Sequence, residues 1–505
     1  MSIRAAPLLV AFVASGLTLG SAGAQEAPAS PIGVCSPLAA GLEPASLLRD
    51  MGRAMGVERV GPGTLHLGMT DATLEDYQSD RTYPPYFLGF TARETWYRPG
   101  TGVARHASRI SFPFNAGDFP PLLSGPNATF QARDTLVRPA PSAQGGALSL
   151  RGMDPWAQLY DWSHGGAVRV AGRCVVRDYP RTVLERVGPY GPERLALDPK
   201  TGLPVLLERE EPHYLWGQTR VAYVYSNWRL EGAFAYPGTS FRMVDGVAET
   251  SRTIADAELA VPDSTPSLAL PDTTLRMPPS VAGFLQPTPP DSVRVSDATR
   301  LLTNPGYTEG VVLAGDTLFV LDATQGEERA RADSALIARL FPGPHPIVLV
   351  VTDLAWPHVA GVRYWVARGA TVVSHRASRR FLERVLARRW TRAPDLYERR
   401  RGRAPLVFRA VNDSLRLAGG KIRVLAVDGI SSEGALVAYV EGDRFLWASD
   451  YIQSVQQPST YLIEVWRAVR RAGLTPRQTA AQHLPLTPWS TIDSLARAAA
   501  LDEAT

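Results

Sequence analysis

The stretch from His345 to His375 constrains the fold most, because it holds two short apolar runs with a helix-like segment between them. The runs HPIVLVVT and ATVVSH lack the alternation of a half-exposed strand, so we expect two buried strands. The segment PHVAGVRYWVARG predicts a helix, with Pro357 at a favourable first position and Gly369 at its end. The junction between the first strand and this helix contains Asp353 and His358, residue types that enzymes use to bind metal at such a place.

The rest of the chain divides by its sequence patterns into two large parts. Residues 46–260 contain successive segments of alternating apolar and polar residues bounded by turn residues, which predicts one curved antiparallel β-sheet. Residues 261–295 are rich in proline, serine and threonine and predict a linker. Residues 296–505 mix strand and helix patterns, so the predicted fold class is α+β. Residues 25–45 are expected to form a flexible lead before the sheet.

The first 24 residues have the pattern of a secretory signal peptide. Arg4 precedes the apolar run APLLVAFVASGLTLG, and Ala22-Gly23-Ala24 fits the small residues of a signal-peptidase site. No later segment reaches the roughly 18 uninterrupted apolar residues that a spanning helix needs. We therefore expect an exported protein, periplasmic or secreted, without a transmembrane segment.

Charge and cysteine content exclude one class of partner and one kind of site. The net charge of +4, from 53 basic and 49 acidic residues, is too mild and too dispersed for a nucleic-acid-binding protein. Two cysteines, Cys35 and Cys174, are too few for a cysteine-based metal site. In an oxidising compartment they either form one disulfide or remain free thiols, and the sequence leaves both open.

Four segments of the C-terminal half follow one another in a recognisable order. They are GVVLAGDTLFVLDA, TDLAWPHVAG, GALVAYVEGDRFLWASD and QHLPLTPWSTIDSL. In this order they resemble the metallo-β-lactamase superfamily, over residues 296–505. The resemblance implies an αββα sandwich with two metal ions at the edge of its sheets. It also implies hydrolysis by a water molecule that the metal ions activate.

The family signature Thr-His-x-His-x-Asp-His falls on TDLAWPH, where most of the ligands are replaced. Thr352 matches, but Asp353 and Ala355 stand where the first two histidines are expected. Pro357 replaces the aspartate, and His358 keeps its identity. Among the replaced positions only Asp353 could still bind a metal, because alanine and proline offer no ligand atom.

The other expected ligands lie further along the chain. Ser431 stands where a third histidine is expected, Asp450 matches the aspartate that bridges the two metals, and His483 matches the terminal histidine. The first metal position is therefore emptied. His358, Asp450 and His483 could still hold one Zn²⁺ or Fe²⁺, with Asp353 as an additional candidate ligand.

Two functions stay open for this half of the chain. A protein that has lost so many ligands is expected to be a catalytically impaired or inactive hydrolase homologue that binds no metal. The alternative is a hydrolase with a single metal ion, whose bound water is the nucleophile. His375, which follows the second buried strand, is then a candidate substrate contact.

Two further features concern ligands other than a metal. The segments LALDPKTGLPVLLE and VAYVYSNWR resemble the half-barrel domains of lipoprotein carriers. This implies an envelope protein whose N-terminal sheet binds a lipid or another small molecule, and the alternative is a plain core under a covering helix. The arginine-rich segment 376–403 predicts either a solvated helix face or a patch for anionic headgroups.

Overall fold

The computed structural model describes residues 30–502 apart from several short segments. These segments are residues 39–40, 75–85, 112–115, 127–128, 134–135, 140–148, 189, 261–264, 271–288, 402, 431 and 456–459. The expected signal peptide and Ser431 lie outside the described residues, so the statements about them stay predictions.

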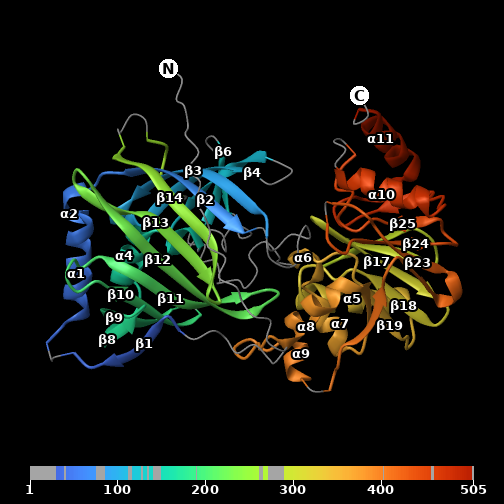
Figure 1. The fold of residues 1–505 in the computed structure, drawn as a ribbon, viewed down its shortest axis with the longest axis horizontal. Helices are drawn as coiled ribbons and strands as arrows, with labels where there is room; N and C mark the ends of the chain where they lie inside the picture. Colours follow the sequence, from blue (N-terminus) through green and yellow to red (C-terminus); the bar gives the residue numbers. More distant parts are fainter. Residues whose placement is uncertain are drawn as a thin grey trace.

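An antiparallel sheet dominates the N-terminal part of the chain (Figure 1). Its described residues form 14 strands in the order β1-β8-β9-β10-β11-β12-β13-β14-β2-β3-β4-β5-β6-β7. Most neighbours in the sheet are consecutive in the chain, as expected for alternating segments joined by tight turns. The strands are β1 Ile32–Ser36, β2 Leu65–Leu74, β3 Leu88–Arg98, β4 Val103–Ser111, β5 Ala116–Ser124, β6 Thr129–Arg133, β7 Leu136–Pro139, β8 Val168–Val176, β9 Tyr179–Gly188, β10 Gly191–Leu197, β11 Pro204–His213, β12 Gly217–Glu231, β13 Phe234–Val244 and β14 Val247–Leu259.

The turn between β10 and β11 illustrates how local chemistry sets these hairpins. The Asp198 carboxylate accepts hydrogen bonds from the backbone N–H groups of Lys200 and Thr201, at 2.9 and 3.1 Å. Gly202 closes the turn with φ +74°, a conformation that side chains disfavour. The predicted turn at residues 198–202 is therefore present.

Two helices cover one face of this sheet and create its core. They are α1, Pro44–Met55, and α4, Pro155–His164, with the short α2, Val57–Val60, after α1. Met51, Trp156 and Trp162 are buried against strands of the sheet. The core thus resembles that of any sheet covered by helices, and the likeness to lipoprotein carriers stays a prediction.

The expected flexible lead contains a strand. β1 pairs antiparallel with β8 at one edge of the sheet, and Cys35 lies opposite Cys174. The structure joins these two cysteines by a disulfide bond. Pairing and cross-link together hold the described part of the lead on the sheet, which small and proline-rich residues did not suggest.

The C-terminal part contains two further sheets. Within the described residues, sheet B has seven strands and sheet C has six. Sheet B contains β15 Asp291–Arg294, β16 Thr299–Asn304, β17 Tyr307–Ala314, β18 Thr317–Leu321, β19 Ile347–Val350, β20 Thr371–His375 and β21 Val407–Val411. Sheet C contains β22 Ser414–Leu417, β23 Ile422–Ala426, β24 Leu436–Val440, β25 Phe445–Trp447, β26 Gln478–Ala480 and β27 Thr487–Pro488. Sheet B therefore begins inside the predicted linker 261–295.

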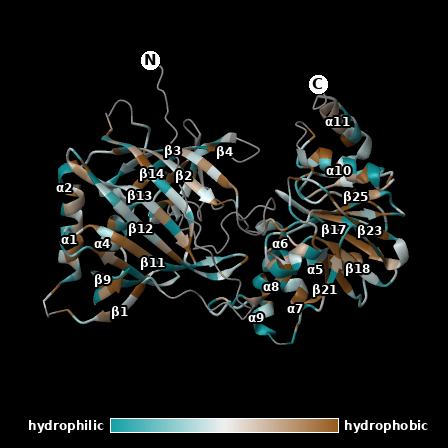
Figure 2. Ribbon diagram, in the orientation of Figure 1, coloured by the Kyte–Doolittle hydropathy of each residue, from teal (hydrophilic) through white to brown (hydrophobic). Residues whose placement is uncertain are grey.

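The two sheets are layered between helices. One hydrophobic cluster joins sheet B to sheet C, a second lies between sheet B and its helices, and a third lies between sheet C and its helices. Apolar residues accordingly concentrate on the strands (Figure 2). The helices are α5 Glu327–Leu340, α6 Trp356–Val359, α7 Val362–Ala367, α8 Arg379–Ala387 and α9 Leu396–Arg399 beside sheet B, and α10 Thr460–Arg471 and α11 Trp489–Asp502 beside sheet C. The mixed α and β fold class is confirmed, and the layers follow the order that the family resemblance implied.

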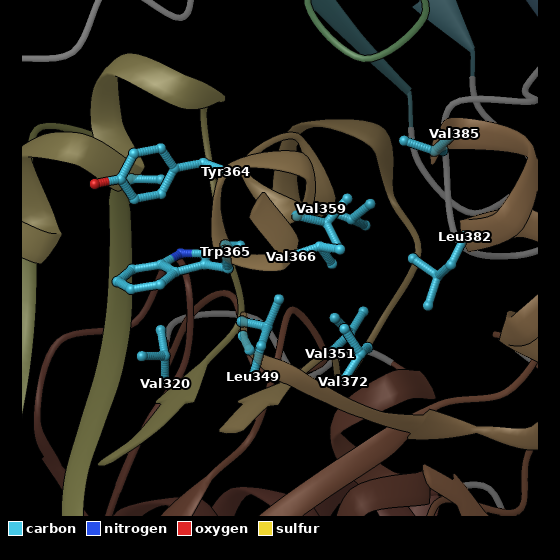
Figure 3. Close-up of a cluster of buried hydrophobic side chains, with 14 of the residues drawn as sticks. Val320, Leu349, Val351, Val359, Tyr364, Trp365, Val366, Val372, Leu382 and Val385 are labelled. Carbon is cyan, nitrogen blue, oxygen red and sulfur yellow. The ribbon is translucent and has the colours of Figure 1, made fainter. Parts of the chain in front are cut away.

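The predicted helix between β19 and β20 is interrupted. It forms two short helices, α6 and α7, separated at Ala360 and Gly361. Gly361 packs closely against Ala323, whose carbonyl oxygen would lie 3.1 Å from an added Cβ. Valines and Trp365 of this segment cover β19 and β20 (Figure 3). None of the described helices is long and apolar enough to cross a membrane.

The hairpin between β11 and β12 inserts into the helical layer beside sheet B. Leu215 and Trp216 at its tip belong to the same buried cluster as α6, α7 and α8. The ring of Trp216 meets Trp356 of α6 edge to face at 5.4 Å and Phe381 of α8 at 5.5 Å. Aromatic contacts of this kind add to the burial of apolar area. The N-terminal sheet and the C-terminal sandwich therefore share a hydrophobic core at this point.

Two arginines of the segment 376–403 stabilise the contact between the β11–β12 hairpin and the helices beside sheet B. Arg388 donates to the backbone carbonyls of Trp216 and Gln218, at 2.9 and 2.8 Å, and to the carboxylate of Asp245 at 2.7 Å. Arg392 forms an ion pair with Glu210 at 2.7 Å. These two arginines bind protein groups, which accounts for part of the arginine content of the segment, and the patch for anionic headgroups stays a prediction.

Replacing Arg388 by methionine is expected to lower the free energy of unfolding by about 2 kcal/mol. The change leaves two carbonyls and one carboxylate without their donor in a largely buried place. Urea unfolding at pH 7 measures the effect. Arg389→Met is the matched control, because Arg389 is exposed and pairs only with Glu398; its expected cost is below about 1 kcal/mol. Equal losses for both variants would contradict the role of Arg388.

His213, at the base of the same hairpin, makes the contact sensitive to acid. Its Nδ1 accepts from the backbone N–H groups of Leu215 and Trp216, both at 3.1 Å. Burial lowers the pKa of His213 from 6.5 to about 3, and the charges of Arg242 and Arg388 act in the same direction. The stability that neutral His213 contributes is therefore complete above pH 6.5 and is lost as the pH falls toward 3.

The variant His213→Asn tests this dependence, because an asparagine oxygen can accept the same backbone N–H groups but does not titrate. Between pH 6.5 and 4 the wild type should lose up to about 1.4 kcal/mol per pH unit more than the variant. Urea unfolding at several pH values measures the difference. If the free energy of unfolding fell equally with pH in the two proteins, His213 would not be the source of the acid sensitivity.

Candidate metal centre

The ends of parallel strands bring the candidate residues together. β18 runs parallel to β19 in sheet B, and β25 runs parallel to β26 in sheet C. The carboxyl ends of each pair therefore meet at one edge of the sandwich, where ligands bind in many α/β proteins. The residues that follow these strands are Asp322 after β18, Thr352 and Asp353 after β19, Ser449 and Asp450 after β25, and Gln482 and His483 after β26.

His358 projects from α6 and is held by one nitrogen. The Nδ1 atom lies 3.0 and 3.2 Å from the two carboxylate oxygens of Asp353, and the ring is 4% exposed. Burial acts to lower the pKa of His358, but Asp353 and Asp450 outweigh burial and raise this pKa to about 9. With Nδ1 occupied by Asp353, Nε2 is the atom left for a ligand.

His483 is held in the same manner by a different acceptor. Its Nδ1 donates to the carbonyl oxygen of Gly306 at 2.6 Å. Its Nε2 lies 3.4 Å from Oδ1 of Asp450. Burial and the nearby His358 lower the pKa of His483, which favours the neutral ring. A histidine that donates through Nδ1 and keeps a lone pair on Nε2 is the form that binds metal.

The Asp450 side chain is 12% exposed, and its enclosed oxygen Oδ1 accepts no hydrogen bond within the described part of the chain. Oδ2 accepts from Nε2 of Gln453 at 3.1 Å, whereas Oδ1 has no hydrogen-bond partner among the described residues. Burial raises the pKa of Asp450 to about 7, although the charge of His358 opposes this rise. An unsatisfied enclosed carboxylate oxygen is costly, so Oδ1 of Asp450 is available to bind a cation.

These three residues fit a single metal ion. One ligand atom from each of His358, Asp450 and His483 lies within 4.8 Å of the other two. Ligands of a tetrahedral ion at 2.0–2.1 Å lie about 3.3 Å apart, close to the 3.4 Å between His483 and Asp450. Small side-chain movements would bring His358 into the same shell. Two imidazoles and one carboxylate suit Zn²⁺ or Fe²⁺, and the donor set alone does not choose between them.

Asp353 has a different position from that of the trio. Its carboxylate accepts from Ser449 Oγ at 2.8 Å, from Gln482 Nε2 at 3.1 Å and from the backbone N–H of Ala355 at 2.8 Å, besides His358. Burial acts to raise the pKa of Asp353, and His358 with the hydroxyl of Ser449 lowers it below the ordinary value. Asp353 therefore orients His358, and the described ligand trio does not include it.

A second buried carboxylate completes this network and was missed in the sequence. Asp322 accepts from the backbone N–H of Thr352 at 2.7 Å, from Nε1 of Trp447 at 2.8 Å and from Nε2 of Gln482 at 2.9 Å. Burial raises the pKa of Asp322 to about 6. The signal available in the sequence was an aspartate directly after the apolar strand LFVL. It has φ +67°, a conformation that few residues other than Gly, Asn and Asp adopt.

Other expected residues lie apart from the trio. Ala355 and Pro357 offer no ligand atom, and Pro357 occupies the first turn of α6. His375 ends β20 and lines a separate pocket with Asp413 and Glu433. Tyr307 of β17, by contrast, lies beside both histidines, with ring centroids 5.0 Å from His483 and 6.0 Å from His358. Its role was not anticipated, because nothing in TNPGYTEG marks it.

Comparison with known proteins gives matches among solved structures alone. No protein-family model matches the chain, and no curated protein matches it. The chain is similar to DIM-1 metallo-beta-lactamase, with 13% identity, a TM-score of 0.32 and coverage of 42% of this chain and 99% of that one. It is also similar to a metallo-beta-lactamase from Hirschia baltica (12%, 0.33, 42% and 97%) and to one from Pontibacter korlensis (14%, 0.32, 41% and 99%). Similarities of this size carry no information on activity.

Replacement by asparagine is expected to have opposite effects on stability at Asp353 and at Asp450. In metal-free protein, Asp353→Asn should lower the free energy of unfolding by about 2–3 kcal/mol, because an acceptor oxygen becomes a donor facing other donors. Asp450→Asn should leave stability unchanged or raise it, because it removes a largely buried charge whose Oδ1 accepts no hydrogen bond and has only His483 Nε2 nearby among the described residues, at 3.4 Å. Urea unfolding in the presence of a chelator measures both. A loss of 2 kcal/mol in Asp450→Asn would contradict this interpretation.

Proposed function

We propose that this protein is a hydrolase-type metalloprotein with a single divalent ion held by His358, Asp450 and His483. The observation that carries the proposal is the unsatisfied Oδ1 of Asp450 beside two histidines whose Nδ1 atoms are already bound. Ala355 and Pro357 supply no ligands for a second ion, so the proposed site is mononuclear. The order of sequence segments that resembles the metallo-β-lactamase superfamily is what suggests a hydrolytic reaction.

The chain's own residues divide the work in this proposal. A bound ion would supply an activated water at neutral pH. Asp353 fixes the ring of His358 and stabilises its protonated form. Nε2 of His358 would therefore release its proton when a cation binds in its place. The carbonyl of Gly306 fixes the ring of His483. Tyr307 covers the two imidazoles, and burial with the Asp450 charge raises its pKa to about 12, so it stays a hydroxyl donor.

A catalytically inactive homologue is the second candidate. It is favoured by the replacement of expected ligands with Ala355 and Pro357, and by the commitment of Asp353 to hydrogen bonds within the protein. In this case the network at the sheet edge is only structural, and His358 remains paired with Asp353 as a buried ion pair.

Export forms part of the same proposal. The N-terminal 24 residues have the pattern of a secretory signal, and the Cys35–Cys174 disulfide suits an oxidising compartment. Both features support a periplasmic or secreted location.

Metal analysis of the mature protein tests the proposal. We expect one equivalent of Zn²⁺ or Fe²⁺ per chain after dialysis, measured by elemental mass spectrometry. His358→Ala and His483→Ala should each weaken binding by more than the roughly 10–100-fold that loss of a residue behind a ligand causes. His375→Ala is the matched control and should bind normally. Hydrolysis of a chromogenic cephalosporin and of a p-nitrophenyl phosphodiester then separates an active hydrolase from a metal-binding protein without turnover.

Metal content below one tenth of an equivalent, after incubation with excess Zn²⁺ and separately with Fe²⁺, would exclude the metal site. Stoichiometric binding that survives His358→Ala together with His483→Ala would place the ion elsewhere. A loaded protein that hydrolyses neither substrate supports the inactive homologue.

A further inference from the structure

A second pocket lies where the N-terminal sheet meets the C-terminal sandwich. It has a volume of about 410 Å³, and its lining comes from the β9–β10 turn, the β11–β12 hairpin and residues 390–393 after α8. Volumes of about 300–1,000 Å³ are typical of sites for small molecules. The pocket is separate from His358, Asp450 and His483, and the proposed function does not use it.

Close packing fixes the walls of this pocket across the boundary. Gly191 and Gly217 have φ values of +126° and +71°, and a Cβ on either would collide with Arg392 or Trp390. The Gln218 side-chain oxygen accepts from the backbone N–H groups of Thr391 and Arg392, at 3.0 and 2.8 Å. The pocket is thus a built feature of the contact rather than a gap between loosely placed parts.

The charged groups along the pocket are already paired. Glu210 forms an ion pair with Arg392 at 2.7 Å. Glu211 forms ion pairs with Arg209 at 2.6 Å and Arg242 at 3.2 Å. A charged ligand would have to break one of these pairs or remain uncompensated, which is costly in a partly buried place. The pocket therefore favours an uncharged ligand.

The remaining lining is apolar or donates hydrogen bonds. Val187, Tyr190, Pro212 and Trp390 supply apolar and aromatic surface. His213 also lines the pocket, and its Nδ1 accepts two backbone N–H groups. The neutral ring must then carry its proton on Nε2, and this N–H donor has no acceptor among the described residues.

The indole Nε1 of Trp390 is no such donor, because it lies against Gly217 and is closed off from solvent. The single N–H donor of His213 on otherwise apolar walls suits a ligand that offers an acceptor oxygen. An aromatic or aliphatic skeleton would fill the apolar part of the pocket.

We propose that this pocket binds an uncharged, mainly apolar small molecule that carries a carbonyl or similar acceptor. The ligand contacts both parts of the chain at once. Its binding therefore stabilises their contact through the β11–β12 hairpin, whose His213 lies against Trp356 with ring centroids 5.1 Å apart.

Prodan, a neutral dimethylaminonaphthalene with one ketone, is a suitable probe because its fluorescence shifts to the blue in apolar sites. We expect saturable binding to the full-length mature protein, with a dissociation constant below about 100 μM. Ala393→Trp and Val187→Trp fill the pocket from its two sides at exposed positions, and each should weaken binding at least tenfold. Ser163→Trp is the matched control, because it fills a different apolar pocket beside α1 and α4.

The analogue without the ketone, 2-dimethylamino-6-propylnaphthalene, tests the acceptor by competition against prodan. It should bind at least fivefold more weakly, because the N–H donor of His213 then remains unpaired.

Each outcome decides for or against the pocket. Absence of saturable prodan binding overturns the proposal, and so does binding that survives both filling variants. Loss of binding in Ser163→Trp places the probe in the other pocket and also overturns it. Equal affinity of the ketone and its analogue removes the acceptor from the proposal. Circular dichroism and the urea midpoint show that the filling variants remain folded.

Discussion

The buried carboxylate of Asp353 is the constraint on which the edge of the sandwich depends. Asp353 is 2% exposed, so its carboxylate needs hydrogen-bond donors. These donors come from three separate segments of the chain. Ser449 follows β25 of sheet C, Gln482 follows β26, and His358 belongs to the helix after β19. The carboxylate thus ties sheet B to sheet C at the end where their parallel strands stop. Asp322, which follows the neighbouring strand β18, also accepts hydrogen bonds from residues of both sheets.

This constraint explains how the loop after β19 is stable although it lacks most of the metal ligands that the sequence resemblance led us to expect. Asp353 stands where a histidine ligand is expected, yet it orients the remaining histidine from behind. The N–H of Ala355 donates to the same carboxylate, and Pro357 begins α6, where a missing N–H costs little. The replaced residues therefore support the local backbone. Asp450 is different, because its Oδ1 accepts no hydrogen bond from the described residues and lies 3.4 Å from Nε2 of His483.

The spacing of apolar residues in the sequence predicted much of the fold, because this spacing depends on which faces of the strands and helices are buried. The runs IVLV and TVVSH became β19 and β20, and the turns at Asp198 and Gly315 close the hairpins that were expected there. The break between α6 and α7 was not predicted, since it depends on the contact of Gly361 with a carbonyl from a distant segment. Asp322, Gln482 and Tyr307 were missed for the same reason. Their importance comes from neighbours that the fold supplies, and single residues after ordinary strands give no pattern.

The two halves of the chain are joined close to the candidate metal centre. Trp356 precedes His358 by two residues in α6, and its ring meets His213 and Trp216 of the N-terminal hairpin. A four-residue helix has too few internal hydrogen bonds to hold its own position, so packing must supply the rigidity. The hairpin supplies part of it, and Arg388 holds the hairpin by its carbonyls. The position of His358 therefore depends on Asp353 within the sandwich and on the hairpin of the N-terminal sheet. This hairpin lies more than a hundred residues before His358 in the sequence.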